Sequence, residues 1–466
     1  MSESGGVGLE ASATILFVID GIAREAMLFA AIGFLIGGID DLLVDLAYGI
    51  ARLRSWLCRD LPRSLTASPM PMALFIPAWD EAAVIAPMLR ATLARYGDAD
   101  YRIYVGTYPN DPATITAVAA VAATDPRVRL VVGPVPGPTT KADCLNALWR
   151  ALLRDEAAGE PCAAVVLHDA EDLVHPLELA VFAAWLSDHD AVQLPVQPLA
   201  DARSPLVAGH YLDEFAESHG KNLIVREALG AAIPFAGVGC AIRREMLGRI
   251  ADSRGGQPFD AASLTEDYEL GLTVAALGGR TRFVRARDAS GALVAVRAYF
   301  PASLPAAVRQ KARWLTGIAL AGWDRVGWQR GGSIGEHWMR MRDRRATLAI
   351  PVLAIAYLGL LAWGASLVGH RLTGAPMPAI EGPMAQLLGC NALLLGWRVA
   401  MRVAFTGAAH GPVQAALAVP RVLVANYVAL FAARRAIVIY WPTLRGAAAR
   451  WDKTAHHFPE SREDAA

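Results

Sequence analysis

The chain has 466 residues, in which 44 basic side chains balance 44 acidic ones, so its formal net charge is zero. Charged residues make up only 19% of the chain, fewer than the roughly one quarter of soluble domains, and apolar residues make up 54%. This composition excludes a disordered chain, a collagen, a coiled coil and a basic nucleic-acid binder, and it indicates a water-facing part joined to a few membrane segments.

The cysteines and histidines, which could form disulfides or bind zinc, are scattered along the chain. The five cysteines are odd in number and none has C-x-x-C spacing, so neither a disulfide framework nor a zinc site is expected, and a reducing compartment fits. The histidines, including His168, His219 and His456, are expected to be structural. The opening MSESGGVGLE has acids and no basic stretch, so we expect no cleavable signal peptide.

A first membrane span is expected between Thr14 and Ile50. Six charged residues interrupt it and leave its limits open, namely Asp20, Arg24, Glu25, Asp40, Asp41 and Asp45. Basic residues follow at Arg52, Arg54, Arg59 and Arg63, and by the positive-inside rule they place this end in the cytoplasm. Residues 1–64 are therefore predicted to hold a membrane span and a juxtamembrane helix.

Between residues 70 and 285, short apolar runs alternate with helical patterns. Strands are predicted at 72–76, 101–105, 128–132, 163–167 and 191–196, and helices at 81–96, 113–123 and 141–154. This alternation predicts a doubly wound α/β domain, Rossmann-like, with a mostly parallel sheet and helices on both faces. In such domains ligands bind beyond the carboxyl ends of the strands. We assign residues 65–340 to this domain.

Polar side chains follow the first two predicted strands. Asp80 and Glu81 come directly after the first strand, and Asp111 comes after the second. Turns favour such residues, so each signal is weak alone. Together with Lys141 and Asn146, they predict a nucleotide pocket in which acids hold the base and ribose and the lysine holds the diphosphate.

The string AVVLHDAED places His168, Asp169, Glu171 and Asp172 after the fourth predicted strand. Asp169 and Glu171, at positions i and i+2, can point into one crevice and hold Mg²⁺ or Mn²⁺. These cations prefer oxygen ligands and keep positions open for substrate phosphates. The alternative is a turn of solvated acids that caps the next helix.

The string SLTEDYELG predicts the start of a helix. Ser263 and Glu266 have capping-box spacing, which would make Glu266 purely structural. Asp267 and Glu269 then stand in the first helical turn, where a carboxylate facing the crevice could accept a proton from a substrate hydroxyl. The alternative is that all three acids complement the helix dipole.

The string VRQKARWLTG puts Gln310, Arg313 and Trp314 on a helix that leads toward the membrane. An indole face stacks on a sugar ring, and a guanidinium neutralises phosphate. Read alone, this string favours an interfacial helix with Trp and Arg at headgroup level.

The C-terminal region, residues 341–466, contains the clearest membrane span. Residues 346–369 carry no charge and, at about 1.5 Å per residue, are long enough to cross a core of roughly 30 Å. Basic residues at 340–345 precede this span and predict a cytoplasmic flank. A second span is predicted at 383–405, with Arg398 and Arg402 near the cytoplasmic face.

The segment 412–439 is ambiguous because it contains Pro420, Arg421, Arg434 and Arg435 among apolar residues. We expect a helix lying in the membrane interface more than a span, followed by a basic cytoplasmic tail. About three crossings result, with the α/β domain inside the cell.

Taken in order, these strings resemble family 2 glycosyltransferases of the GT-A fold. They are most similar to the membrane-embedded members related to cellulose, chitin and hyaluronan synthases. The family's P-x-x-N/D-E and G-K-x-x-A-L-N match PAWDE at 77–81 and KADCLN at 141–146. Its D-x-D, T-E-D and Q-x-x-R-W correspond to DAE at 169–171, TED at 265–267 and QKARW at 310–314. The tail WDKTAHHFP also resembles that of bacterial inner-membrane glycosyltransferases known as phage-adsorption proteins.

The resemblance covers about residues 70–320 and implies a role for each matched residue. It implies that the nucleotide sugar is bound by Asp80, Glu81, Asp111, Lys141 and Asp169. It implies that Asp169 and Glu171 ligate the metal and that Asp267 is the catalytic base. It also implies that the diphosphate and the acceptor are bound by Gln310, Arg313 and Trp314. The sequence departs from the family where YPND at 108–111 replaces the usual D-D-G-S, and where Glu171 replaces an Asp.

The implied activity is inverting, Mg²⁺- or Mn²⁺-dependent transfer of a sugar from a UDP-sugar to a growing exopolysaccharide. The resemblance places the chain in the bacterial inner membrane as a multi-pass protein with a cytoplasmic catalytic domain. Three spans are few for a pore, so an outer-membrane or periplasmic export partner, or oligomerisation, is expected. Alternatives are transfer to a polyprenyl phosphate, a catalytically silent receptor or scaffold, and, less favoured, a glycosidase.

Overall fold

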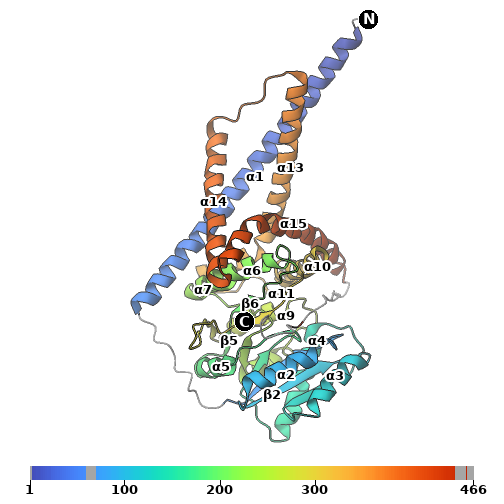
Figure 1. Ribbon diagram of the computed structural model, residues 1–466, viewed down its shortest axis with the longest axis vertical. Helices are drawn as coiled ribbons and strands as arrows, with labels where there is room; N and C mark the ends of the chain where they lie inside the picture. The colour runs from blue at the N-terminus through green and yellow to red at the C-terminus, as the bar shows by residue number, and fades with distance from the viewer. Residues whose placement is uncertain (1–2, 59–69, 447–457, 459–466) are drawn as a thin grey trace.

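The computed structural model describes residues 3–58, 70–446 and 458. Figure 1 shows an α/β domain below and long helices above it. Helices α1 (Glu3–Cys58), α13 (Ala346–Thr373) and α14 (Gly382–His410) rise away from the domain. Helix α15 (Pro412–Thr443) lies over the domain, packed on α6 (Gly209–Glu217) and α10 (Leu304–Leu315).

A seven-stranded sheet forms the centre of the α/β domain, in the order β3-β2-β1-β4-β7-β5-β8. These strands are β1 (Met72–Pro77), β2 (Tyr101–Thr107), β3 (Val128–Val132), β4 (Ala164–Leu167), β5 (Ala191–Gln193), β7 (Cys240–Arg243) and β8 (Thr281–Phe283). All neighbouring pairs are parallel except those of β7, which runs antiparallel to β4 and β5. The predicted α/β fold with a mostly parallel sheet is confirmed.

Several predicted boundaries differ from the observed ones, and two of these differences have a clear local reason. The strand predicted at 191–196 ends at Gln193, because Pro195 cannot donate to a ladder, and the chain then starts β6 (Val196–Pro198), which pairs with β9 (Val296–Ala298) in a second sheet. The helix predicted at 81–96 is α2 (Ile85–Tyr96), which begins four residues later than predicted. The reason is that the carbonyl of Glu81 accepts turn hydrogen bonds from the backbone N–H groups of Val84 and Ile85.

Helices cover both faces of the sheet. The helices of the domain are α2 (Ile85–Tyr96), α3 (Pro112–Ala122), α4 (Lys141–Ala157), α5 (Glu178–Leu186), α6 (Gly209–Glu217), α7 (Leu223–Ala228), α8 (Arg244–Ser253), α9 (Glu266–Ala276), α10 (Leu304–Leu315), α11 (Ala321–Val326) and α12 (Ile334–Arg344), with the π-helices η1 (Ser218–Asn222) and η2 (Thr316–Leu320). In β1, Leu74 and Ile76 pack toward α2 and α5, while Ala73 and Phe75 pack toward α4 and α8. Burial on both faces explains why this strand is apolar without alternation.

In the part of the chain that the structure describes, four helices are long and apolar enough to cross a membrane: residues 13–57 of α1, together with α13, α14 and α15. The sequence predicted about three crossings and an interfacial helix at 412–439. By length and composition α15 also qualifies as a span, yet in Figure 1 it lies over the α/β domain and not alongside α13 and α14. The number of crossings stays a prediction.

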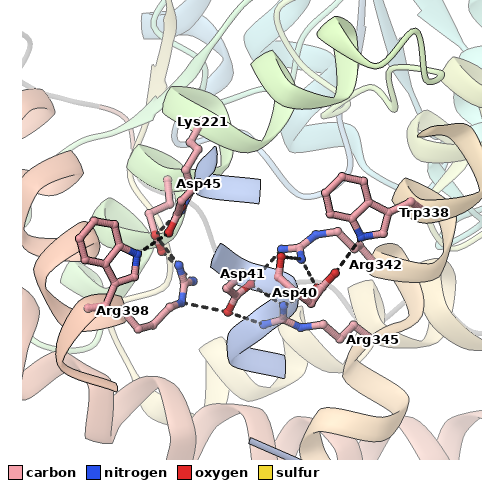
Figure 2. A network of polar contacts seen from close by, with 10 residues as sticks. Asp40, Asp41, Asp45, Lys221, Trp338, Arg342, Arg345 and Arg398 are labelled. Carbon is pink, nitrogen blue, oxygen red and sulfur yellow. Dashed lines mark hydrogen bonds and ion pairs between the residues drawn. The ribbon is translucent and has the colours of Figure 1, made fainter. Parts of the chain in front are cut away.

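Three of the acids that interrupt the first predicted span, Asp40, Asp41 and Asp45, join α1 to the rest of the chain (Figure 2). Asp40 accepts a hydrogen bond from the Trp338 indole at 2.7 Å and pairs with Arg342. Asp41 lies 3.0 Å from Arg342, and it also pairs with Arg345 and with Arg398 of α14, the latter at 3.4 Å. These charges therefore do not end the helix, because basic residues from α12 to α14 neutralise them.

We expect Asp41→Ala to lower the apparent melting temperature in detergent by several degrees. The change leaves three arginines without a carboxylate they share, and breaking a buried pair destabilises more than the pair itself contributes. Asp252→Ala, an exposed acid on α8, is the control and should leave the melting temperature unchanged. Equal melting temperatures for both variants would contradict a structural role for this network.

Candidate active site

A cavity of about 430 Å³ opens beyond the carboxyl ends of β1 and β4. Eight of the ten predicted site residues line it: Glu81, Lys141, Asp169, Glu171, Asp267, Gln310, Arg313 and Trp314. They come from the segment after β1, the start of α4, the turn after β4, the start of α9 and one face of α10. The topology thus gathers motifs that lie more than 230 residues apart in the sequence into one cavity.

The turn after β4 carries Asp169 and Glu171, the predicted metal ligands, and buried side chains hold it in place. The Asp172 carboxylate accepts a hydrogen bond from the Asp169 backbone at 2.9 Å and lies 3.0 Å from His168 Nδ1. On its other side, His168 Nε2 lies 3.1 Å from Glu178, and all three of these supporting side chains are buried. Burial alone would lower the pKa of His168, but Glu178 and Asp172 raise it to about 10. His168 therefore has a structural part in holding this turn.

Lys141 brings a positive charge to the acid cluster. It starts α4, whose first turn is capped by the Thr140 hydroxyl. Its ammonium lies 2.5 Å from Asp169 Oδ1 and 3.9 Å from Glu266 Oε1, and it donates to the Gly237 carbonyl at 3.4 Å. Burial alone would lower the pKa of Lys141, but the surrounding carboxylates hold it above its ordinary value. The site therefore keeps a cation next to its acids.

Glu266 and Asp267 begin α9 at the edge of the cavity. Burial and the neighbouring charge of Asp267 raise the pKa of Glu266 to about 7. Burial likewise raises the pKa of Asp267, although Lys141 opposes the shift. Carboxyl groups whose pKa values move toward neutrality are better proton acceptors near neutral pH than ordinary ones.

The predicted capping box at 263–266 is wrong. Thr265 is the residue that precedes α9, and no side chain caps this end. Ser263 instead donates to Glu269 Oε1 at 2.6 Å, and Arg325 also pairs with Glu269. Glu269 is thus occupied away from the cavity, whereas Glu266 lines it.

One face of α10 supplies Gln310, Arg313 and Trp314, at spacings that a helix brings together. Phe215 from α6 also lines the cavity, and its ring centre lies 6.3 Å from that of Trp314. Phe300, another lining residue, lies 4.9 Å from Phe215 between ring centres. Trp314 therefore belongs to an aromatic wall, defined here as Tyr211, Phe215, Phe300 and Trp314.

Sequence reasoning missed several lining residues, namely Asp201, Arg203, Phe215, Phe300 and Arg309. Arg309 directly precedes Gln310 on α10, so helical position could have suggested it. The others stand in segments with no recognised motif, and only the tertiary fold brings them to the cavity.

Three residues predicted in the nucleotide pocket are not among those that line the cavity. Asp80 and Asp111 are not among the lining residues; Asp111 caps α3 and also accepts the backbone N–H of Asp80 at 2.6 Å. Asn146, predicted beside Lys141, is buried and bonds to both backbone groups of Phe259. Its predicted place in the pocket is wrong, because the helix turns it away from Lys141 and into the core.

Gly237 stands between Ala236 and Val238, which both line the cavity, and its φ is +79°. A Cβ atom there would lie 2.5 Å from Asp267 Oδ2 and 3.3 Å from Lys141 Nζ. We expect Gly237→Ala to lower activity at least tenfold, because it displaces these charged groups, and misplacement by about 1 Å can cost about 10²-fold. Gly278→Ala is the matched control, since its φ is +77° but a Cβ would meet no atom within 4 Å. An equal fall in activity in the two variants would assign the effect to backbone strain, and wild-type activity in Gly237→Ala would contradict the steric argument.

The comparisons with known proteins agree with this geometry. The family described as glycosyltransferase like family 2 matches residues 69–317, more than half of the chain. Two curated relatives are the bacteriophage adsorption protein B of Escherichia coli K12 and the bacteriophage N4 adsorption protein B of Escherichia coli O157:H7. Each is 34% identical over 490 aligned residues, covering 98% of this chain. The chain spans 64% of the length of these relatives.

Among solved structures, a mannosyltransferase from Pyrobaculum calidifontis in complex with GDP-Man and Mn²⁺ aligns with a TM-score of 0.54. The alignment covers 85% of this chain and 99% of that one at 18% identity, so it shows a shared fold. The chain therefore belongs to glycosyltransferase family 2, and its α/β domain is a glycosyltransferase domain of the GT-A fold.

Proposed function

We propose that this protein transfers a sugar from a nucleotide sugar, a UDP-sugar in the first instance, to a growing exopolysaccharide at the bacterial inner membrane. The observation that carries the proposal is the shared cavity, in which three acids, Asp169, Glu171 and Asp267, lie with the cations Lys141 and Arg313. A diphosphate leaving group needs positive charge, and an attacking hydroxyl needs a proton acceptor. This cavity offers both.

A divalent cation fits the donor set of this cavity. Among the described residues, no three His, Cys, Asp or Glu side chains converge into a site that could hold an ion unaided. Mg²⁺ and Mn²⁺ are, however, commonly held by one or two carboxylates together with substrate phosphates. Asp169 and Glu171 would supply these carboxylates. When bound, the cation would neutralise charge on the departing diphosphate.

The residues of the chain perform the remaining steps. Lys141 and Arg313 bind and neutralise the diphosphate, and Glu81, with Asp80 and Asp111 behind it, holds the uridine end. The bond from the sugar C1 to the diphosphate oxygen breaks as a bond from the acceptor oxygen to C1 forms on the opposite face. Asp267 takes the proton of the acceptor hydroxyl, so a single displacement inverts the anomeric carbon. The transition state resembles an oxocarbenium ion.

The membrane helices and the aromatic wall support an acceptor that is a polysaccharide. Aromatic faces stack on sugar rings, and Gln310 adds a polar contact near Trp314. A polyprenyl-phosphate acceptor is the second candidate, favoured by the lining arginines Arg203 and Arg309. An export partner in the periplasm or outer membrane would extend the pathway of a secreted polymer.

Nucleotide release from a panel of UDP- and GDP-sugars, measured with the purified protein in detergent with Mn²⁺ or Mg²⁺, tests the proposal. We expect release with at least one donor at a rate well above that without protein. Release restricted to GDP-sugars would replace the uridine assignment. Absence of release with every donor would favour a silent receptor or scaffold that keeps the fold.

A further inference from the structure

Helix α6 contributes to the aromatic wall and also packs on α14 and α15, and its two faces differ. One face carries Tyr211 and Phe215, four residues apart, which lie 4.8 and 4.9 Å from Phe300 between ring centres. Tyr211 also lies 6.1 Å from Trp314, and the Lys311 ammonium lies 4.5 Å from the Trp314 ring and pairs with Glu214. This face of α6 therefore builds half of the aromatic wall.

The opposite face carries Asp213 and Glu217, also four residues apart and both buried. Asp213 Oδ1 lies 3.1 Å from the Arg421 guanidinium of α15 and accepts a hydrogen bond from Thr406 of α14 at 3.2 Å. Glu217 accepts two hydrogen bonds from Arg398 of α14, at 2.7 and 3.0 Å. Two acids thus fix the back of α6 to α14 and α15.

Helix α1 also contacts this region, through η1, the helical segment that directly follows α6. Lys221 in η1 lies 2.6 Å from Asp45 of α1 and 3.3 Å from Glu217 (Figure 2). Asp45 also accepts a hydrogen bond from the indole of Trp397, the residue before Arg398. Three membrane-associated helices, α1, α14 and α15, therefore contact α6 and η1 through charged groups.

Buried ion pairs are a poor source of stability, because desolvation of the charges offsets their attraction. Their strict geometry makes them better suited to fixing one arrangement of the helices they join. Here the joined element carries Phe215, a lining residue of the active-site cavity. A shift of α6 would move Phe215 and Tyr211 relative to Trp314 without moving the acids after β4 or at the start of α9.

We propose that Asp213 and Glu217 are positioning residues, through which the packing of α1, α14 and α15 sets the aromatic wall that receives the acceptor. The inference rests on the proposed glycosyl transfer. The position of the aromatic wall then decides whether the sugar of the donor is transferred to the acceptor or hydrolysed by water. In both outcomes the bond between C1 and the diphosphate breaks; the new bond goes to the acceptor oxygen in transfer and to a water oxygen in hydrolysis, and the proton is released to Asp267. Displacement of the aromatic wall therefore favours hydrolysis by water over transfer to the acceptor.

The test measures both fates in native membrane vesicles, which retain the endogenous acceptor. A nucleotide sugar that is active in the donor panel is supplied with a radiolabel in the sugar. Label in polymer or in a lipid extract counts as transfer, and label in free sugar counts as hydrolysis. We expect Asp213→Asn and Glu217→Gln to lower the ratio of transfer to hydrolysis about tenfold. Nucleotide release per folded protein should change less than about threefold, and Glu217→Asp, which keeps the charge, should recover part of the ratio.

The matched control is Asp20→Asn. Asp20 is an acid of α1 that bonds to Ser366 and His370 of α13 and does not contact α6. Its ratio should equal that of the wild type even if the protein is less stable, because a general loss of folded protein lowers transfer and hydrolysis together. Phe215→Ala, which alters the wall directly and leaves both acids in place, should reproduce the low ratio.

Unchanged ratios in Asp213→Asn and Glu217→Gln would overturn the inference, as would an equal fall in Asp20→Asn, since the effect would then belong to the whole bundle. Both results leave the proposed function intact, because nucleotide release continues. Failure of the wild-type protein to release nucleotide from any donor would instead overturn the proposed function and this inference with it.

Discussion

Replacing Asp267 with asparagine is expected to lower sugar transfer by about 10² to 10⁴-fold, the usual contribution of a general base. The change keeps the size of the side chain and the oxygen that accepts the Tyr268 backbone N–H at 2.8 Å, so the start of α9 should persist. What is lost is the carboxylate that takes the proton of the acceptor hydroxyl. Single-turnover transfer from the donor identified in the panel, measured from pH 6 to 9, provides the test.

Asp252→Asn, an exposed acid on α8, controls for the loss of one negative charge and should transfer at the wild-type rate. Binding of the nucleotide diphosphate to Asp267→Asn should stay within a few-fold of wild type, because the asparagine removes no contact assigned to the diphosphate. Near-native turnover in Asp267→Asn would show that another group accepts the proton.

Loss of the two acids after β4 is expected to have a comparably large effect. Asp169→Asn and Glu171→Gln should each lower transfer by several orders of magnitude. Each change removes a ligand of the divalent cation, and this cation would be the main group that neutralises the leaving diphosphate. Chelation of divalent cations should do the same to the wild-type protein, and Mn²⁺ should restore it. Mn²⁺ binding in the presence of UDP, followed by the loss of the free-ion electron paramagnetic resonance signal, is a readout independent of turnover.

Glu156→Gln is the matched control for this pair. Glu156 is a partly buried acid that pairs with Arg244 at 2.8 Å, outside the residues that line the cavity. Its Mn²⁺ binding and transfer should resemble those of the wild type. Transfer that survives chelation in the wild type would remove Asp169 and Glu171 from the metal assignment.

Much of the α/β domain could be predicted from the sequence because its signals are local. Five strand positions and three helices follow from short apolar runs and helical periodicity, and the strand at 128–132 agrees with β3 at both ends. The motifs at 169–171 and 310–314 also predicted residues that share one cavity. These predictions succeed because parallel strands bring their carboxyl ends to one edge.

The features that the sequence did not predict depend on partners far along the chain. Asp213 and Glu217 look like a solvated helix face, and only the structure shows that Arg398 and Arg421, more than 180 residues later, neutralise them. Strand β7 is only four residues long, and no local signal indicates that it runs antiparallel between β4 and β5. Ser263 has the spacing of a capping residue, but a competing bond to Glu269 takes its hydroxyl.

The length of α1 has a consequence for how the protein can move. The 45 residues from Ala13 to Leu57 span roughly 68 Å as a helix, about twice the thickness of a bilayer core. In the C-terminal half of this helix, Asp40, Asp41 and Asp45 pair with basic residues on α12, α14 and η1 and with the residue before α13. Sliding by one helical turn, about 5.4 Å, would break all these pairs at once. These pairs, together with the bonds of Asp20 to Ser366 and His370, therefore hold α1 in one register against the other helices.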